Sequence, residues 1–436
     1  MNIVRLKNII KKLPVREVTV FCIITVIFVI SLLASAMIPQ SAIKDKMLKS
    51  AEYLCEGKQF YTIIDDYYGS RVDRYADSIL LGIAWQYDAD HPLRSVMRSA
   101  YYHVDRQNEN DSLMEAVRDG KNATQQYLRY WHGSIAVVRP LMLVMSVREI
   151  YILNGVILAA LGVIFTIVLI RRKYAAFALG MLIGLIAVAA CFVPFSLEYT
   201  WTFILMFIFS LIVLGMAGKD RDKQFRTAFL CFGMITCFFD FLTTETLTLT
   251  VPLLLLLRIE KDKKKSEKTW KVPVRMTVMW GLGYVLTWIM KWVIASIVLG
   301  ENVMPYVSEH IAERIGGTKF IAAGPVRYLV ESVVRNVMCL FPIGWGAAGV
   351  VIGIILIVLY IYIAYVYRVK GADKKQILMY VFIGCIPYIR YLVLHNHAYL
   401  HNFFTYRAQL ATILAMVLIL EELKVGEGLR HEKKSK

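Results

Sequence analysis

The chain has 436 residues, of which 58% are hydrophobic and 19% charged, and its formal net charge is +17. A mean hydropathy of +0.54 excludes an ordinary soluble protein and is typical of a chain with many membrane-spanning helices. The positive charge does not indicate a nucleic-acid-binding protein, because Lys and Arg gather in short segments between apolar runs and form no single basic face.

Ten apolar runs predict ten membrane-spanning helices, since a helix of about 20 apolar residues crosses the hydrocarbon core of a bilayer. They cover residues 18–38, 150–170, 175–193, 200–216, 227–241, 247–257, 278–299, 346–367, 377–394 and 409–420. The fifth and sixth runs are short, which favours tilted or broken helices. The expected fold class is therefore an all-α integral membrane protein, a single polytopic domain with a long first extracytoplasmic loop that bears interfacial helices.

The distribution of basic residues predicts the orientation of these helices. The outer turns 194–200 and 242–246 carry no Lys or Arg, whereas every expected inner segment carries at least three. By the positive-inside rule, both termini are then cytoplasmic. Residues 39–150 and 300–345 form extracytoplasmic loops, 421–436 form a basic cytoplasmic tail, and the working face is the outer one. The inner segments are 1–16, 171–173, 219–226, 258–275, 368–375 and 424–436.

The loop of residues 39–150 is far longer than a connection between two helices requires. Long loops that are not linkers usually carry function, and one stretch of this loop, 61–80, is rich in aspartate and tyrosine. We expect one of its aspartates to act as a base that deprotonates an attacking hydroxyl. The alternative is a solvated acidic turn that caps a helix starting near Ser70. Helical spacing predicts short surface helices at 73–81 and 95–103. The aspartates are Asp65, Asp66, Asp73 and Asp77.

Two short sequences in this loop resemble a known enzyme family. Asp-Asp-Tyr-Tyr at 65–68, followed by Asp-His-Pro-Leu at 90–93, is similar to the first outer loop of GT-C glycosyltransferases. The second position is usually Glu in that family, and Leu93 stands where a second Pro is usual. The resemblance implies Asp65 as catalytic base, Asp66 as its supporting partner, and a polyprenyl-phosphate-linked sugar as donor. It also implies a bacterial cytoplasmic membrane and a cell-envelope glycan, lipid or protein as acceptor.

A second cluster of polar residues follows the ninth run. His397 and His401 are four residues apart, so on a helix they share one face, as zinc ligands can. We favour a binding site for a phosphate and a sugar, in which Arg390 and Arg407 neutralise the phosphate and the imidazoles, including His395, donate hydrogen bonds. The alternative is a polar and aromatic belt at the membrane interface.

Two further groups complete the candidate site. Arg129, His132 and Arg139 close the long loop and are expected to hold the donor phosphate. Asp240 and Glu245 join the two short runs and are expected either to line a substrate cavity or to coordinate a divalent cation. The alternative for this pair is a plain outer turn whose threonines cap the next helix.

These patterns predict a membrane glycosyltransferase that moves a sugar from a polyprenyl-phosphate donor to a cell-envelope acceptor on the outer face of the membrane. No Gly-rich phosphate loop and no DNA-binding motif occurs, so the donor must arrive activated as a lipid-linked sugar, and the expected partners are membrane lipids and no nucleic acid. Two alternatives stay open. One is a transporter or flippase of a lipid-linked saccharide, and the other is a membrane acyltransferase that works through a histidine of the 395–401 cluster.

Overall fold

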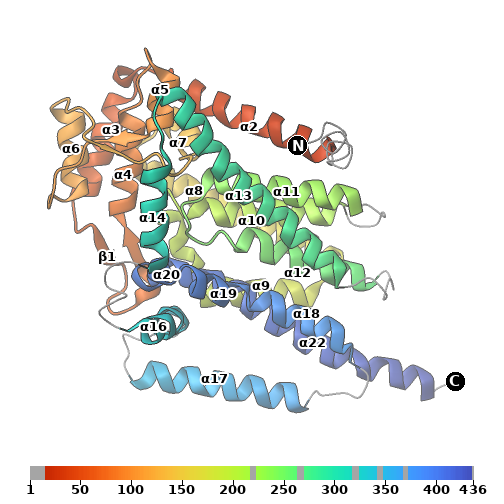
Figure 1. Ribbon diagram of the computed structural model, residues 1–436. Helices are drawn as coiled ribbons and strands as arrows, with labels where there is room; N and C mark the ends of the chain where they lie inside the picture. The colour runs from red at the N-terminus through yellow and green to blue at the C-terminus, as the bar shows by residue number, and fades with distance from the viewer. Residues whose placement is uncertain are drawn as a thin grey trace.

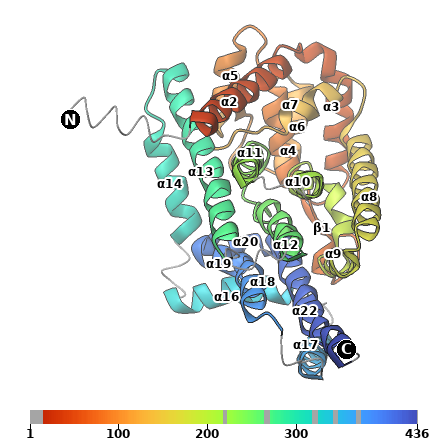
Figure 2. The same ribbon diagram turned by 90° about the vertical axis from the view of Figure 1, so that its right-hand side faces the viewer.

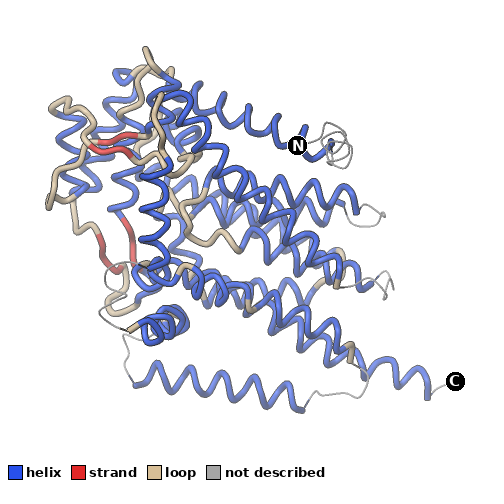
Figure 3. Tube along the Cα trace, in the orientation of Figure 1, coloured by secondary structure: helices blue, strands red, loops and turns tan. Residues whose placement is uncertain are grey.

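The computed structural model describes residues 15–216, 222–262, 270–316, 324–340, 347–366 and 372–434. Parts of the predicted inner segments and of the outer loop 300–345 lie outside these ranges. In the described residues the fold is almost entirely helical, with two small antiparallel two-stranded sheets (Figure 3). The two pairs are β1 (Phe60–Thr62) with β2 (Arg71–Asp73), and β3 (Ala100–Tyr101) with β4 (Gln125–Gln126).

Each of the ten predicted runs contains a helix. Six helical stretches of the described chain are long and apolar enough to cross a membrane, which confirms the expected class of all-α membrane protein. That all ten helices cross remains a prediction. The helices are α2 (Val15–Ala36), α8 (Val147–Arg171), α9 (Ala175–Ala187), α10 (Thr200–Met216), α11 (Asp222–Phe239), α12 (Leu247–Asp262), α13 (Lys271–Leu299), α17 (Ala347–Val366), α18 (Lys374–Gly384) with α19 (Ile386–Val393), and α22 (Leu410–Lys434).

Most of these helices form one bundle, and the first long loop folds against one end of it (Figures 1 and 2). Helix α17 lies at the edge, away from the outer loop (Figure 1). The predicted tail from residue 421 continues α22 as a helix to Lys434. Near this tail Arg258 of α12 holds Glu421 with two hydrogen bonds of 3.0 Å, and Lys261 pairs with Glu422. These ion pairs fasten α22 to α12.

Helices α11 and α13 cross with almost no space between their backbones. An added Cβ on Gly283 would lie 2.2 Å from the carbonyl oxygen of Leu230, and one on Gly233 would lie 2.0 Å from that of Trp280. Small residues at a helix crossing permit such close approach, as they do in membrane bundles generally. This contact aligns the ends of the two helices that lie near the first long loop, where the polar residues gather.

The first long loop is a packed subdomain, so the expectation of helices lying on the membrane surface is wrong for its central helix. All of α4 (Arg74–Trp85) except Tyr75 and Ala76 is buried. Asp73 caps α4 by accepting a hydrogen bond of 2.9 Å from the backbone N–H of Ala76, which confirms a helix from residue 74. The other helices of the subdomain are α3 (Gln40–Cys55), α5 (Pro92–Arg98), α6 (Glu109–Arg118) and α7 (Ile135–Leu141).

The predicted helix at 95–103 is wrong at both ends. Helix α5 begins at Pro92, since proline is well suited to a first helical position, and it stops at Arg98 because Ser99 adopts a left-handed conformation with φ of 48°. Residues 100–101 then pair with 125–126 as a strand. Helical spacing alone did not reveal this long-range pairing.

Buried contacts fasten the subdomain to the membrane helices. The ammonium of Lys291 on α13 donates to the carbonyl oxygens of Val96 at 3.0 Å and Met97 at 3.2 Å, near the C-terminal end of α5. The indole of Trp131 donates to the carbonyl oxygen of Thr287 at 2.8 Å. These bonds hold the subdomain over one end of the bundle.

The described part of residues 300–345 adds two helices, α14 (Met304–Gly316) and α16 (Pro325–Met338). Asn396 on α20 (His395–Leu400) binds both of them. Its amide donates to the carbonyl oxygen of Glu313 at 2.6 Å, and its oxygen accepts from the hydroxyl of Tyr328, also at 2.6 Å. Helix α14 is thereby held against the histidine-rich segment.

Candidate functional site

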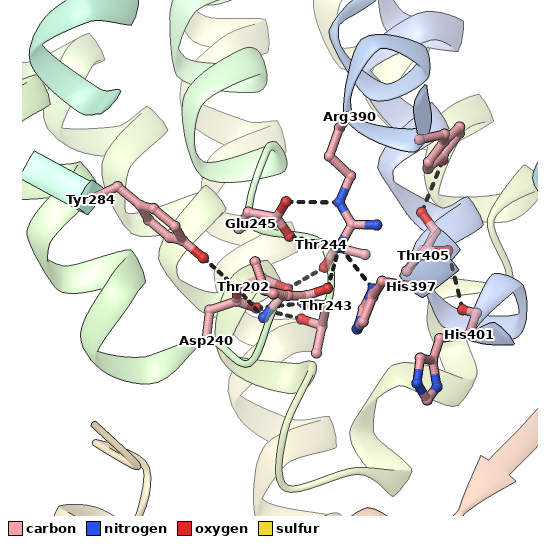
Figure 4. A network of polar contacts seen from close by, with 12 residues as sticks. Thr202, Asp240, Thr243, Thr244, Glu245, Tyr284, Arg390, His397, His401 and Thr405 are labelled. Carbon is pink, nitrogen blue, oxygen red and sulfur yellow. Dashed lines mark hydrogen bonds and ion pairs between the residues drawn. The ribbon is translucent and has the colours of Figure 1, made fainter. Parts of the chain in front are cut away.

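The short fifth and sixth runs are joined by a non-helical turn that is almost completely buried. Asp240 organises this turn: its carboxylate accepts from the backbone N–H groups of Leu242 at 2.7 Å and Thr243 at 3.0 Å, and from the Thr243 hydroxyl at 2.6 Å (Figure 4). The Tyr284 hydroxyl donates a fourth bond at 3.2 Å. With these partners Asp240 stabilises the backbone that carries Glu245.

Glu245 and Arg390 form a buried ion pair between this turn and α19. Arg390 Nε donates to Glu245 Oε1 at 2.8 Å, and Nη2 donates to the Leu242 carbonyl oxygen (Figure 4). A guanidinium paired with a carboxylate in this way contributes no net charge to a ligand. The structure therefore places the predicted site residues Glu245 and Arg390 together, but they bind each other and their charges are not available to a ligand.

His397 and His401 lie side by side, with ring centroids 4.7 Å apart. Burial lowers the pKa of His397 well below its ordinary value and that of His401 to about 3, with the other histidine and nearby arginines adding to the effect at His397. Both rings are therefore neutral. Within the described part of the chain, no group of three or more His, Cys, Asp or Glu side chains is placed to hold a metal ion.

The remaining predicted basic residues hold backbone carbonyls. Arg407 is fully buried and donates to Phe403 at 3.1 Å and to Gly69 at 2.9 Å. Arg139 is also fully buried and donates to Ser35 and, at 3.3 Å, to Tyr87. Both arginines anchor segments of the fold to one another.

Two of the predicted histidines also bond to the backbone. His132 Nε2 lies 2.9 Å from the Tyr127 carbonyl oxygen, and burial lowers the pKa of His132 to about 3. His395 Nδ1 lies 3.2 Å from the Leu392 carbonyl oxygen. Because a carbonyl only accepts, each ring carries its proton on the nitrogen that faces it.

Asp65 and Asp66 lie in the turn between β1 and β2. Both are exposed, and among the described residues neither carboxylate makes a hydrogen bond or an ion pair. Asp66 has a φ of 57°, as the turn requires. In the strand register Asp73 pairs with Phe60, at the end of the hairpin opposite the turn. The structure thus separates the exposed pair from the buried aspartates of the same stretch.

The buried carboxyl groups gather beneath the subdomain. Asp77 accepts from the Tyr151 hydroxyl and, at 2.8 Å, from the backbone N–H of Leu197. Through this bond α4 holds the segment that carries Glu198. The Glu198 carboxylate makes no hydrogen bond or ion pair within the described ranges, and its side chain is half-buried. Glu198 therefore remains free to contact a ligand.

The surroundings of these carboxyl groups change their pKa values. Burial raises the pKa of Asp73 to about 6, and its bond from Ala76 and the Arg71 guanidinium limit the rise. Burial raises the pKa of Glu198 well above its ordinary value, the carboxylates of Asp73, Asp77 and Asp240 raise it further, and Arg314 lowers it. With a pKa of about 6, Asp73 is largely ionised at neutral pH, whereas burial and the acidic neighbours favour the protonated form of Glu198. Strongly perturbed pKa values in neighbouring carboxyl groups are typical of functional sites.

A cavity of about 60 Å³ lies at the same end of the bundle, between the subdomain, α13 and α14. Arg129, Trp288 and Arg314 line it, together with Tyr130, Leu242 and His310. Four arginines were predicted to bind the phosphate, Arg129, Arg139, Arg390 and Arg407, and of these four, all within the described ranges, only Arg129 lines this cavity. Sequence reasoning missed Arg314 and Trp288, because neither lies in a motif and their proximity depends on the packing of α14 against α13.

Comparisons with protein-family models, with curated proteins and with solved structures find no match to this chain. The arrangement of its own side chains is therefore the basis for assigning a function.

Proposed function

We propose that the protein is a membrane glycosyltransferase, with both termini in the cytoplasm, that transfers a sugar from a polyprenyl-phosphate donor to a cell-envelope acceptor at the outer face of the membrane. The observation that carries the proposal is the pair of neighbouring carboxyl groups, Asp73 and Glu198: burial raises the pKa of both, and the Arg314 guanidinium is close enough to Glu198 to oppose the rise there. A base with a pKa slightly below neutral suits deprotonation of a hydroxyl at the pH of the cell envelope.

In this mechanism Asp73 replaces the exposed Asp65 as the base. Asp73 takes the proton of the acceptor hydroxyl, whose oxygen forms the new bond to the anomeric carbon. The bond between that carbon and the phosphate oxygen breaks, and its electron pair stays on the phosphate. The Glu198 carboxyl forms a hydrogen bond with the sugar, and the positive charge of Arg314 stabilises the charge that develops on the leaving group.

An apolar groove supports a substrate with a lipid carrier. It has a volume of about 790 Å³, and α8, α9 and α10 line it with side chains such as Leu158, Leu182 and Phe207. Its lining includes Cys191 and Pro194 in the 3₁₀ helix Ala190–Phe195, which directly precedes the segment of Glu198. An isoprenoid chain in this groove would lie close to the carboxyl pair, as the reaction requires.

The experiment measures transfer of radiolabelled sugar from polyprenyl-phosphate donors by purified full-length protein in detergent. Asp73→Asn is the decisive variant, because asparagine caps a helix as well as aspartate but cannot accept the proton. We expect it to lose at least about a hundredfold in rate, the usual contribution of general base catalysis.

Asp65→Asn is the matched control, since it makes the same change at an exposed position, and we expect it to retain near-normal activity. Full activity in Asp73→Asn with loss in Asp65→Asn would return the catalytic role to the exposed pair. Absence of transfer from every donor, with tight binding of the lipid-linked sugar, would favour the transporter.

A further inference from the structure

Helix α16 exposes its apolar side chains. Val326, Val330 and Val334 are 75%, 55% and 43% exposed. They follow one another at intervals of four residues, so they lie on one face of the helix. A helix on the surface of a soluble protein has the opposite arrangement, because its apolar face packs on the core. The exposed valines therefore indicate that this face of α16 does not lie in water.

The other two faces of α16 are polar. One of them packs on the protein: the Asn336 amide donates to the Ala398 carbonyl oxygen at 2.9 Å, and its oxygen accepts from the Thr405 hydroxyl at 2.6 Å. The other is charged and carries Arg327, which pairs with Glu331 at 2.6 Å. A helix with one apolar and one charged face is typical of the boundary between a membrane and water.

Helix α14 is divided in the same way. Its exposed apolar residues are Met304, Ile311 and Ile315, and their spacing of seven and four residues places them on one face. His310 and Arg314 lie on another side of the helix, where they line the cavity of about 60 Å³. Helix α14 therefore stands between this cavity and whatever covers its apolar face.

Both helices run across the axis of the bundle at its edge (Figures 1 and 2). Figure 1 shows α14 at a steep angle to the long helices and α16 nearly end-on, and Figure 2 shows α16 lengthwise. A helix that crosses the axis of a membrane bundle lies along the plane of the membrane, as interfacial helices do. The position of α14 and α16 thus agrees with their division into faces.

The apolar faces of α14 and α16 continue those of helices that are long and apolar enough to cross a membrane. Ile297, in the last turn of α13 just before α14, is 75% exposed. Leu392 and Val393 are exposed on α19, next to Tyr391, whose carbonyl oxygen lies 3.3 Å from the Ser332 hydroxyl of α16. Lipid that surrounds α13 and α19 therefore also reaches α14 and α16.

We propose that α14 and α16 lie in the membrane surface on the side of the subdomain, where phospholipid acyl chains cover their apolar faces, and that this contact holds α14 against the cavity. The partner of this surface is the bilayer itself. The inference does not depend on sugar transfer, so it can fail or succeed independently of the glycosyltransferase.

The first experiment identifies what covers the two faces. The photoreactive residue p-benzoylphenylalanine replaces Ile311 or Val330 in the full-length protein, which is reconstituted in nanodiscs of phosphatidylglycerol and phosphatidylethanolamine and irradiated. We expect the mass of the intact protein to increase by that of one phospholipid. The yield of this adduct should be several times that of the matched controls, in which the same residue replaces Glu309 or Arg327 on the charged sides of the helices. Ile315 and Val334 are the second pair of positions should the first variants unfold.

The other possible occupants give different products. A crosslinked dimer would assign the faces to a second copy of the chain, and an internal crosslink to α17 would assign them to that helix. Either product in place of the lipid adduct would overturn the inference. Equal adduct yields at the apolar and charged positions would also overturn it.

The second experiment tests whether the lipid contact holds α14 in place. Ile311→Asp puts a charge on the apolar face, and we expect it to speed hydrogen exchange of the α14 backbone in nanodiscs by about twofold to fivefold, since charged residues are unfavourable near the membrane interface. Ile311→Leu should exchange like the wild type. Ala312→Asp is the matched control, because it adds the same charge at an exposed position beside the apolar face. Equal exchange in Ile311→Asp and Ala312→Asp would refute the anchoring of α14 by lipid.

Discussion

The Nη2 atom of Arg390 lies 3.3 Å from Nδ1 of His397, and this contact determines the tautomer of the histidine (Figure 4). A guanidinium nitrogen can only donate, so Nδ1 must be the acceptor and the ring proton must reside on Nε2. His397 is thus held as a neutral ring with a defined donor. The ion pair with Glu245 holds Arg390, and the same network therefore orients the histidine.

His397→Asn should be more stable than His397→Ala. The asparagine oxygen takes the position of Nδ1 and still accepts from Arg390, whereas alanine leaves that buried donor with one acceptor fewer. We expect alanine to cost about 1–3 kcal/mol and asparagine clearly less. Thermal unfolding of the two variants in detergent measures the difference. Equal unfolding midpoints would show that the contact with Arg390 does not contribute to stability.

The Arg390–Glu245 pair should show strong coupling. Removing one partner leaves an uncompensated buried charge, so Arg390→Gln or Glu245→Gln alone should destabilise by about 3–5 kcal/mol. The double variant removes both charges and should lose much less than the sum of the single changes. A double-mutant cycle on the free energy of unfolding measures this coupling. Strict additivity would contradict the buried pair.

Asp73 should make both stability and activity depend on pH. Its pKa is about 6 in the folded protein against 3.8 ordinarily, so the folded state binds the proton more tightly. The stabilisation is complete below about pH 4 and is lost as pH rises through about 6, a total of about 3 kcal/mol at 1.4 kcal/mol per pH unit.

Activity should follow the opposite course, because the base must be ionised: kcat/KM rises as pH approaches about 6 and then levels off. Unfolding midpoints and transfer rates from about pH 4 to 8 test both limbs. In Asp73→Asn the part of the stability change that Asp73 contributes and the rise of kcat/KM should disappear, so wild-type and variant stability curves that run parallel over this range would refute the assignment.

The close crossing of α11 and α13 should be intolerant of a single methyl group. Gly283→Ala would place a Cβ 2.2 Å from the Leu230 carbonyl oxygen, and we expect a loss of about 1–3 kcal/mol or more from overpacking. Gly281→Ala lies on the same helix with no atom within 4 Å of the new Cβ. That control should be neutral or slightly stabilising, because alanine favours a helix. Comparable unfolding midpoints for both variants would mean that the helices separate without cost.

The sequence by itself determined the class of the protein, since the hydropathy of a run of residues is a local property that directly predicts a membrane helix. It also identified the aspartate-rich stretch 61–80, and Asp73 as part of it, because turn and cap residues act on their immediate neighbours. Apolar runs, turns and helix caps depend on residues that are close together in the sequence, so they can be recognised without knowing any long-range contact.

Only the tertiary structure decided which charged residues are free. In the sequence, Arg390 and Arg407 flank a histidine-rich segment and were therefore predicted to bind a phosphate. In the structure, Arg390 pairs with Glu245, and Arg407 donates to the carbonyl oxygen of Gly69, which is far away in the chain. Asp65 and Asp73 lie eight residues apart in the numbering, but one is exposed and the other is buried. Which partner a charged side chain contacts, and how deeply it is buried, depend on the packing of distant segments. Burial in turn changes the pKa of a side chain and the strength of its electrostatic interactions. The candidate site is therefore defined only by the packing of α4, α13 and α14 in the folded protein.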